Sequence, residues 1–244
     1  MKGPITLIRN AVDVFLQNPK LFVGIYIIPG ILTFLVTMLV EFQEGLALAT
    51  PVTYTLAAIL WILVIIASIF MGIAMIHAVM NPSLSIMDAY RASTPYFWRY
   101  VILSIVVTLA VLAGFLLLII PGIIFSVWFA FSYYVLIAEG TGGIEAMKQS
   151  KRMVSGKWWA VFGRLLVLVA IGIVVGLIFG LIGALFDEFI GAGVAAVSNL
   201  ILNAILTPIS IAYVYVLYLE LKQVPQADVA SVPDAPQAGE AYTA

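Results

Sequence analysis

The stretch Val101–Ala138, VILSIVVTLAVLAGFLLLIIPGIIFSVWFAFSYYVLIA, contains no charged residue and decides how the chain is threaded. About 20 apolar residues cross a bilayer as a helix, so this stretch has the length of two crossings. Arg99 and Lys148 are the nearest basic residues on either side. Basic residues collect on the cytoplasmic side of membrane proteins, so the stretch must return to the side from which it started. The break available inside it is Pro121-Gly122, which predicts a tight turn at the outer surface.

The composition of the whole chain indicates a polytopic membrane protein. Of its 244 residues, 64% are hydrophobic and 9% are charged, and the mean hydropathy is +1.17. Soluble domains are about half apolar and a quarter charged. We therefore expect an all-α fold, a polytopic membrane helix bundle with six transmembrane spans and cytoplasmic amphipathic interfacial helices. The predicted spans are Leu21–Val40, Val52–Met80, Val101–Ile120, Ile123–Ala138, Ala160–Phe186 and Val194–Leu219.

The charged residues give this threading a direction. All eleven Lys and Arg residues fall on one side of it, whereas the opposite loops carry only acids. The positive-inside rule therefore predicts that both termini are cytoplasmic. The basic residues are Lys2, Arg9, Lys20, Arg91, Arg99, Lys148, Lys151, Arg152, Lys157, Arg164 and Lys222. The acids of the opposite loops are Glu41, Glu44, Asp187 and Glu188.

The pentapeptide IIPGI around Pro121 also occurs at residues 27–31, where it predicts a different structure. Pro29 lies inside the first span, and Pro208 lies inside the sixth. A proline in a helix interior removes a backbone hydrogen bond and clashes with the preceding turn, so each predicts a kink. These kinks either shape the bundle only or also belong to a working site.

A repeated unit lies in the basic loops rather than in the IIPGI copies. Residues 88–93, DAYRAS, match residues 145–150, EAMKQS, in residue type, and an aromatic and basic cluster follows each copy. Ile5–Gln17 is a weaker third copy. The repeat predicts three units, each an interfacial helix with a hairpin, at about 1–80, 81–138 and 139–222. Together they form an integral membrane domain over 1–222, and we expect 223–244 to be a disordered cytoplasmic tail.

Part of the chain resembles a known group of proteins. Residues 121–139, PGIIFSVWFAFSYYVLIAE, followed by GGIEAMKQS at 142–150 and SGKWW at 155–159, resemble the signature of poorly characterised prokaryotic six-span membrane proteins. That group includes the membrane domain joined to some glycerophosphodiester phosphodiesterases. The resemblance implies a multi-pass protein of the cytoplasmic (inner) membrane of a prokaryote. It carries over no catalytic residue.

Two stripes of residues at helical spacing are candidates for packing or for function. Asn199, Asn203 and Thr207 share one face of the sixth span, and polar groups in hydrocarbon need partners. They either line a substrate path beside Pro208 or join helices by hydrogen bonds. The fifth span carries a ridge of small residues that lets a helix approach closely, either the sixth span or a second subunit. The ridge consists of Gly172, Gly176 and Gly180.

A basic group between the fourth and fifth spans is a candidate contact for anionic lipid headgroups, or else it only sets the topology. Its members are Lys148, Lys151, Arg152, Lys157 and Arg164. Arg164 lies inside the fifth span, so it either snorkels or pairs with Glu139 or Glu220. We expect His77, near the inner end of the second span, to be a hydrogen-bonded structural residue rather than a proton carrier.

These observations favour a membrane protein without catalytic activity. The chain has no cysteine and one histidine, and it carries no catalytic motif, so we expect no metal and no cofactor. The leading hypothesis is a lipid-interacting or envelope-associated scaffold or homeostasis role. Its partners would be membrane lipids, anionic ones among them, with a homo-oligomer or a membrane-protein partner as a further option and no nucleic acid. The alternative is a small-solute or lipid permease that uses a polar-lined cavity between kinked helices.

Overall fold

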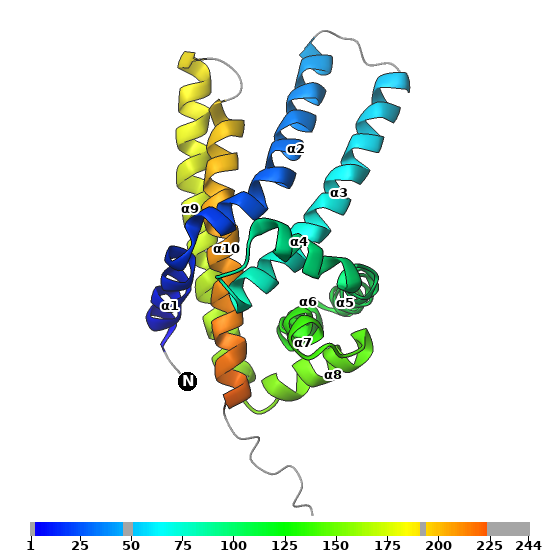
Figure 1. Ribbon diagram of the computed structural model, residues 1–244, viewed down its shortest axis with the longest axis vertical. Helices are drawn as coiled ribbons and strands as arrows, with labels where there is room; N and C mark the ends of the chain where they lie inside the picture. The colour runs from blue at the N-terminus through cyan, green and yellow to red at the C-terminus, as the bar shows by residue number, and fades with distance from the viewer. Residues whose placement is uncertain (1–2, 46–50, 191–193, 224–244) are drawn as a thin grey trace, which may run out of the picture.

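The computed structural model describes residues 3–45, 51–190 and 194–223 (Figure 1). In these ranges every regular element is a helix, which confirms the predicted all-α class. The helices are α1 (Pro4–Gln17), α2 (Pro19–Gly45), α3 (Pro51–Met80), α4 (Ile86–Ser93), α5 (Phe97–Leu117), α6 (Ile119–Phe129), α7 (Ser132–Glu139), α8 (Gly143–Val154), α9 (Trp158–Ile190) and α10 (Val194–Gln223), with a 3-10 turn at Thr94–Tyr96 between α4 and α5.

Six segments are long and apolar enough to cross a membrane, in agreement with the predicted number. They are Pro19–Val40, Tyr54–Met80, Ile86–Leu117, Ile119–Glu139, Trp158–Leu185 and Val197–Gln223. The most apolar stretch of α9 contains no buried residue. Lipid tails are as apolar as leucine, so such a helix gains little by hiding its side chains from them. The fold is therefore that of a polytopic helical membrane bundle.

The long helices form two groups that lie at a large angle to each other. In Figure 1, α2, α3, α9 and α10 run along the long axis of the molecule, whereas α5 and α6 are seen nearly end-on. Within the first group, α10 packs against α2, α3 and α9. The second group is a hairpin in which α5 packs along α6, and it meets the first group through α3 and α9.

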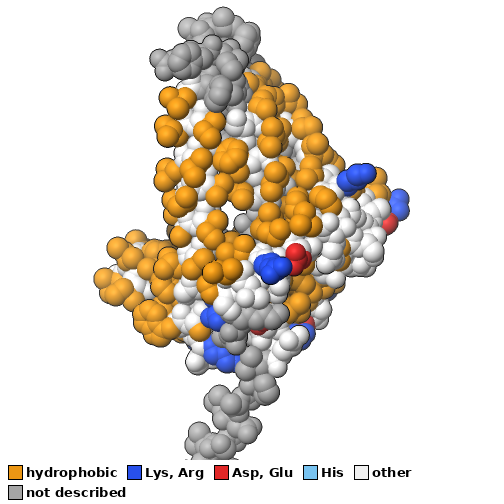
Figure 2. All heavy atoms as spheres, turned by 90° about the vertical axis from the view of Figure 1, so that its left-hand side faces the viewer, with side chains coloured by type: hydrophobic (Ala, Val, Ile, Leu, Met, Phe, Trp, Pro, Cys, Tyr) orange, Lys and Arg blue, Asp and Glu red, His pale blue; other side chains and the backbone are white. Residues whose placement is uncertain are grey.

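Charged and apolar surfaces are separated on the face shown in Figure 2. Charged side chains lie on its right-hand and lower parts, and hydrophobic side chains cover the long helices above them. The predicted acids of the opposite loops, Glu41, Glu44, Asp187 and Glu188, lie outside the residues whose side chains the structure describes. The predicted tail also lies outside the described part of the chain from residue 224 onward.

The turn of the α5–α6 hairpin lies at Leu118, not at Pro121-Gly122. Leu118 is extended, with φ −165° and ψ 156°, and α6 begins at the next residue. Pro121 falls in the first turn of α6, where helical N–H groups have no partner inside the helix, so proline costs nothing there. Gly122 has no positive φ, but a Cβ there would overlap the ring of Phe115. The predicted position of the turn at Pro121-Gly122 was wrong, because the proline lies in the first turn of a helix and the glycine permits close helix packing.

The predicted fourth span is broken into two helices. α6 ends at Phe129 and α7 begins at Ser132. Ser150 of α8 bridges the break, because its hydroxyl donates to the carbonyl of Trp128 at 2.6 Å and accepts from the N–H of Phe131 at 3.2 Å. Backbone groups that a broken helix leaves unpaired must find partners when they are buried. Hydropathy alone did not show this break, since the residues on both sides of it are apolar.

The two matched copies of the repeat form α4 and α8 and bury the same positions. Ala89 and Ala146 are fully buried, and so are Ser93 and Ser150. Between these buried positions, the basic residues Arg91 of α4 and Lys148 of α8 stay exposed. The division of the chain into three units stays a prediction.

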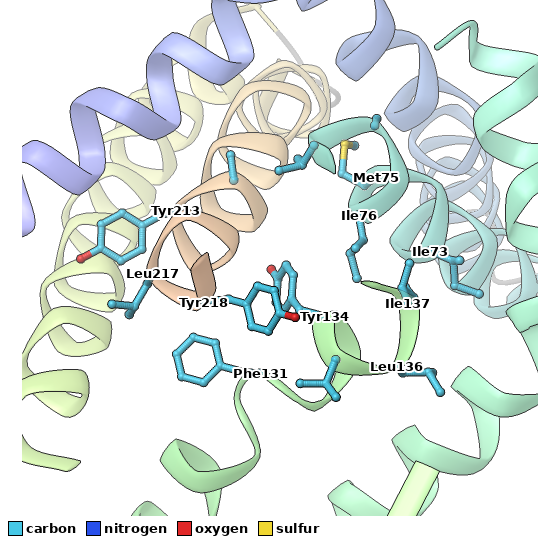
Figure 3. Packing of buried hydrophobic residues seen from close by; sticks show 14 of the residues in the cluster. Ile73, Met75, Ile76, Phe131, Tyr134, Leu136, Ile137, Tyr213, Leu217 and Tyr218 are labelled. Carbon is cyan, nitrogen blue, oxygen red and sulfur yellow. The ribbon is translucent and has the colours of Figure 1, made fainter. Parts of the chain in front are cut away.

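The buried core lies where α3, α7 and α10 meet (Figure 3). Three tyrosines are among its side chains: Tyr134 of α7 with Tyr213 and Tyr218 of α10. The rings of Tyr134 and Tyr218 are stacked, with centroids 6.2 Å apart. The hydroxyl of Tyr134 donates to the carbonyl of Ile211 at 3.0 Å, so this buried polar group is satisfied. The core therefore fastens the α6–α7 arm to the long helices.

The structure places both kink candidates, Pro29 and Pro208, inside helices α2 and α10. Figure 1 shows that α2 bends along its length. Pro29 has no N–H, so the carbonyl of Ile25, four residues earlier, loses its helical partner. The hydroxyl of Tyr90 on α4 donates to that carbonyl at 2.7 Å. The bend of α2 is thus stabilised by Tyr90 of α4, the repeat copy at residues 88–93.

Candidate functional site

A groove of about 630 Å³ opens between α6 and the junction of α8 with α9. Its walls are mainly apolar and include Ile123, Ile124 and Trp128 from α6 with Gly156, Trp158 and Trp159 from the junction. The volume falls within the range of about 300–1,000 Å³ that is typical of small-molecule sites. We call this site the α6–α9 groove.

A sharp turn between α8 and α9 shapes one wall of the groove. Gly156 has φ +79°, a left-handed conformation that residues with a Cβ rarely adopt. The N–H of Lys157 donates to the carbonyl of Val154 at 3.0 Å, and α9 begins at the next residue. The Trp158 ring stacks on Phe162 with centroids 5.0 Å apart. Gly156 therefore lets the chain turn sharply enough to bring the tryptophans beside α6.

Two lysines lie beside this groove. The Nζ atom of Lys151 is 4.3 Å from the centre of the Trp128 ring, which forms part of the wall. Lys157 lies between the wall residues Gly156 and Trp158 in sequence. Lys151 is exposed and Lys157 half-buried, so neither charge is hidden from the surroundings. An apolar cavity with cations beside it matches a ligand that has an apolar chain and an anionic group.

A buried donor lies in the wall of the groove. The indole Nε1–H of Trp158 is buried and has no hydrogen-bond acceptor among the residues that the structure describes. A buried unpaired donor costs about 1–3 kcal/mol. Because protein covers this atom, a ligand in the groove could accept from it only after the wall moved.

The structure divides the other predicted basic residues among different partners. Lys148 and Arg152 both pair with Glu145 of the same helix, at 3.9 Å and 2.7 Å. Arg164 donates from Nη1 to the carbonyl of Ala160 at 2.7 Å, one turn earlier in α9. The basic group is therefore not one uniform patch: two lysines adjoin the groove, and two cations share a carboxylate beside it.

Glu139 pairs with Lys222 rather than with Arg164. Its carboxylate lies 3.1 Å from the Lys222 Nζ atom, and it accepts from the hydroxyl of Tyr218 at 2.9 Å and from the amide of Gln149. The predicted Glu139–Arg164 pair was wrong, because the end of α7 meets the last turns of α10 and not the start of α9. The alternative pairing of Arg164 with Glu220 stays a prediction.

A second and smaller cavity of about 220 Å³ lies between α2 and α10; we call it the α2–α10 crevice. Asn199 and Asn203 line it together with Tyr26, Thr33 and Thr37 of α2. The Asn203 side-chain amide donates to the Asn199 carbonyl at 2.8 Å. Thr207, the third member of the predicted stripe, is not among the residues that line it.

Sequence reasoning missed one wall of each cavity. Tyr26, Thr33 and Thr37 share a face of α2, because residues seven and eleven positions apart are separated by nearly whole helical turns. That spacing could have predicted a polar partner for Asn199 and Asn203. In the groove, Trp128 and the isoleucines of α6 were identified only as part of the predicted fourth span.

The two remaining candidates are the glycine ridge of α9 and His77 of α3. A Cβ at Gly172, Gly176 or Gly180 would meet nothing within 4 Å. α10 is therefore not the partner of this ridge, because it packs against another face of α9; the second-subunit alternative stays a prediction. The His77 ring lies 5.5 Å from the Tyr96 ring, and its buried Nε2 atom has no hydrogen-bond partner among the residues that the structure describes.

The two cavities offer different chemistry. The α6–α9 groove can take an apolar chain beside two cations, and the α2–α10 crevice can hydrogen-bond an uncharged group. Within the described ranges 3–45, 51–190 and 194–223, no group of three or more His, Asp or Glu side chains could hold a metal ion.

Comparison with known proteins gives the family of the chain. A model of an uncharacterised protein family (UPF0259) matches residues 29–219, which is more than half of the sequence, so the chain belongs to that family. A UPF0259 membrane protein from Pectobacterium carotovorum subsp. carotovorum (strain PC1) is 27% identical over 138 residues. This match covers 57% of the chain and 53% of that relative, so the chain spans about half the length of the relative it matches. No solved structure matches the chain. The resemblance to the membrane domain of some glycerophosphodiester phosphodiesterases stays a prediction.

Proposed function

We propose that this member of the UPF0259 family is a non-catalytic protein of the cytoplasmic membrane that binds an anionic phospholipid in the α6–α9 groove. The acyl chain lies against Ile124, Trp128 and Trp159, and the headgroup lies near Lys151 and Lys157. Both termini are on the cytoplasmic side, so the headgroup belongs to the inner leaflet. Holding a lipid between α6 and α9 gives the protein a scaffold or homeostasis role in the envelope.

The observation that carries this proposal is the position of Lys151 over the Trp128 ring at 4.3 Å. The cation–π contact contributes about 0.5–1 kcal/mol at an exposed site and keeps the ammonium beside the apolar wall. The lysine retains its own charge, since an aromatic face does not neutralise it as a carboxylate would. Each favourable basic residue near an anionic membrane surface contributes about 1 kcal/mol.

Native mass spectrometry with defined lipids tests the proposal. We expect phosphatidylglycerol to be retained by the full-length protein in preference to phosphatidylcholine. The double variant Lys151→Gln/Lys157→Gln should bind phosphatidylglycerol about 30-fold more weakly, which corresponds to about 2 kcal/mol for the two charges. Arg91→Gln is the matched control, because it removes a cation from α4, the equivalent helix of the repeat, and should leave the binding unchanged.

Two outcomes would contradict this function. One is wild-type retention of phosphatidylglycerol by the double variant. The other is an equal loss in Arg91→Gln, which would show a general effect of net charge and no specific groove.

Permeation of a small uncharged solute through the α2–α10 crevice is a second candidate function. It is favoured by the gathering of five polar side chains from two membrane-spanning helices around one cavity. Such groups are costly in hydrocarbon unless they have partners or water. Uptake of labelled glycerol into proteoliposomes should be lost in Asn203→Leu and kept in Thr207→Val, which lies outside the lining. Equal uptake by wild type and by protein-free vesicles would exclude this function for glycerol.

A further inference from the structure

The tip of the α5–α6 hairpin is an uninterrupted apolar surface. Its residues, Leu116 to Ile120, are between 68% and 90% exposed. From Leu109 to Phe125 the chain has no polar side chain at all. Burying a large apolar side chain stabilises it by about 1.5–3 kcal/mol relative to water, and each of these side chains would lack that stabilisation at an aqueous surface. The tip is therefore suited to hydrocarbon and not to the aqueous surface that an outer turn would meet.

We propose that the α5–α6 hairpin is re-entrant: it enters and leaves the bilayer on the side of the Lys and Arg residues, and its tip ends in hydrocarbon. The element would then insert into the lipid without emerging from it, and α2, α3, α9 and α10 would be the crossing helices. The tip shares Ile120 with the lining of the α6–α9 groove, but the inference does not depend on the proposed lipid-binding function.

The connections at the outer ends of the other two hairpins carry charged residues, unlike the α5–α6 turn. The connection after the first span carries Glu41 and Glu44, and the one after the fifth span carries Asp187 and Glu188. Turns that reach water usually carry such charges or the Trp and Tyr residues of the interfacial belt. The α5–α6 turn carries neither, although Trp98 and Tyr100 mark the membrane boundary at the other end of α5.

The lengths and directions of the helices agree with a re-entrant α5–α6 hairpin. α5 has 21 residues, so it is about 31 Å long and can cross about 30 Å of hydrocarbon only when it stands upright. Figure 1 shows α5 and α6 nearly end-on where the four long helices run along the page, so both groups cannot be upright together. α2, α3, α9 and α10 have 27–33 residues, or about 40–50 Å, and still cross when they are tilted. A tilted α5 stops short of the far surface.

The non-helical part of the turn is a single residue, Leu118. An unpaired backbone group is costly in hydrocarbon, so a turn with few non-helical residues suits such a place. The N–H of Leu118 donates to the Gly114 carbonyl at 3.1 Å, and the Leu118 carbonyl accepts from the N–H of Gly122 at 3.4 Å. Pro121 brings no N–H that would need a partner. The one extended residue of the turn therefore has both of its backbone groups bonded.

Charge sidedness is satisfied by this arrangement as well. Arg99 and Lys148 must lie on the same side, which requires an even number of crossings between them. A hairpin that crosses the bilayer twice meets that requirement. A re-entrant hairpin that does not cross the bilayer meets it as well.

Single-cysteine labelling tests whether the tip of the hairpin lies in hydrocarbon, because the natural chain has no cysteine. We would treat cells that express Leu118→Cys with a membrane-impermeant maleimide, before and after permeabilisation. The expected result is no labelling in either state, with full labelling after denaturation in SDS. Glu44→Cys is the control for the outer side and should react in intact cells. Ser83→Cys, in the loop between α3 and α4, should react only after permeabilisation. Labelling of Leu118→Cys in intact cells at the rate of Glu44→Cys would overturn the proposal.

Depth-dependent quenching gives a second measurement on the same variant. A fluorophore attached to the thiol of the Leu118→Cys variant in reconstituted vesicles should be quenched more strongly by lipids spin-labelled in the middle of the acyl chain than by lipids spin-labelled at the headgroup. Stronger quenching by the headgroup label would place the tip at a surface and would also overturn the proposal.

Discussion

The helices α4 and α8 have nearly the same sequence pattern but contribute differently to the molecule. Both bury an alanine and a serine at matched positions. The Ser93 hydroxyl bonds within its own helix, to the Ala89 carbonyl at 2.8 Å, whereas the Ser150 hydroxyl bridges the break between α6 and α7. α4 supports the bend of α2 through Tyr90, and α8 places Lys151 over the groove. One repeated helix thus serves as a brace in one unit and as part of a candidate binding site in the other.

The largest expected difference between the two copies is at the matched serines. Ser150→Ala leaves the Trp128 carbonyl and the Phe131 N–H without a partner, and each buried orphan costs about 1–3 kcal/mol. We expect Ser150→Ala to lower the free energy of unfolding by about 2–4 kcal/mol and Ser93→Ala by less than about 1 kcal/mol. Thermal unfolding of both variants in the same detergent measures this. Equal losses would show that the bridge across the helix break contributes nothing.

Tyr90 tests the bracing role of α4. Tyr90→Phe removes the donor to the Ile25 carbonyl that Pro29 leaves unpaired, so the free energy of unfolding should fall by about 1–2 kcal/mol. Binding of phosphatidylglycerol should stay the same, because the groove lies beside the other copy. A loss of lipid binding in Tyr90→Phe would contradict the separation of roles.

Removing the acid at the start of each helix should change lipid binding in α8 and leave it unchanged in α4. Glu145→Gln frees Lys148 and Arg152 from their shared carboxylate, so phosphatidylglycerol should bind about 5-fold more tightly, or by about 1 kcal/mol. Asp88→Asn is the matched change in α4, where the carboxylate accepts from the Ser85 hydroxyl at 2.6 Å. It should weaken the helix start and leave lipid binding unchanged. Lipid titrations of both variants decide between local and general charge effects.

The smallest effect is expected at the glycine ridge of α9. Because a side chain at Gly176 meets open space, Gly176→Leu should change the free energy of unfolding of the monomer by less than about 0.5 kcal/mol. Analytical ultracentrifugation of the same variant reports on a second subunit. A large loss of monomer stability would mean that another part of the chain covers the ridge.

Composition and charge predicted the fold class, since long apolar segments and one-sided basic residues leave few alternatives to a helical membrane bundle. The positions of breaks were harder to predict. Pro121 is compatible with a turn and with a helix start, and the sequence does not show that the chain is extended at Leu118 and helical from Ile119. The break before Ser132 depends on a hydroxyl nineteen residues away in sequence from Phe131, which no local pattern reveals.

Some residues of the candidate site were also predicted from the sequence. The lysines and tryptophans around residue 157 were identified as interfacial, but their apolar counterpart on α6 depends on how the two helices meet. Likewise, Asn199 and Asn203 were identified as a polar stripe, while the polar face of α2 that meets them depends on how α2 and α10 pack. The pairing of Glu139 with Lys222 could not be predicted, because it requires the end of α7 to face α10.

Photocrosslinking with phosphatidylglycerol that carries a diazirine in its acyl chain tests the lipid site most directly. After irradiation of the reconstituted protein, mass spectrometry of its peptides locates the adducts. We expect adducts concentrated on Ile123, Ile124 and Trp159, and their loss in Lys151→Gln/Lys157→Gln. Adducts spread along the open face of α9, around Ile173 and Leu177, with none in the groove, would contradict it.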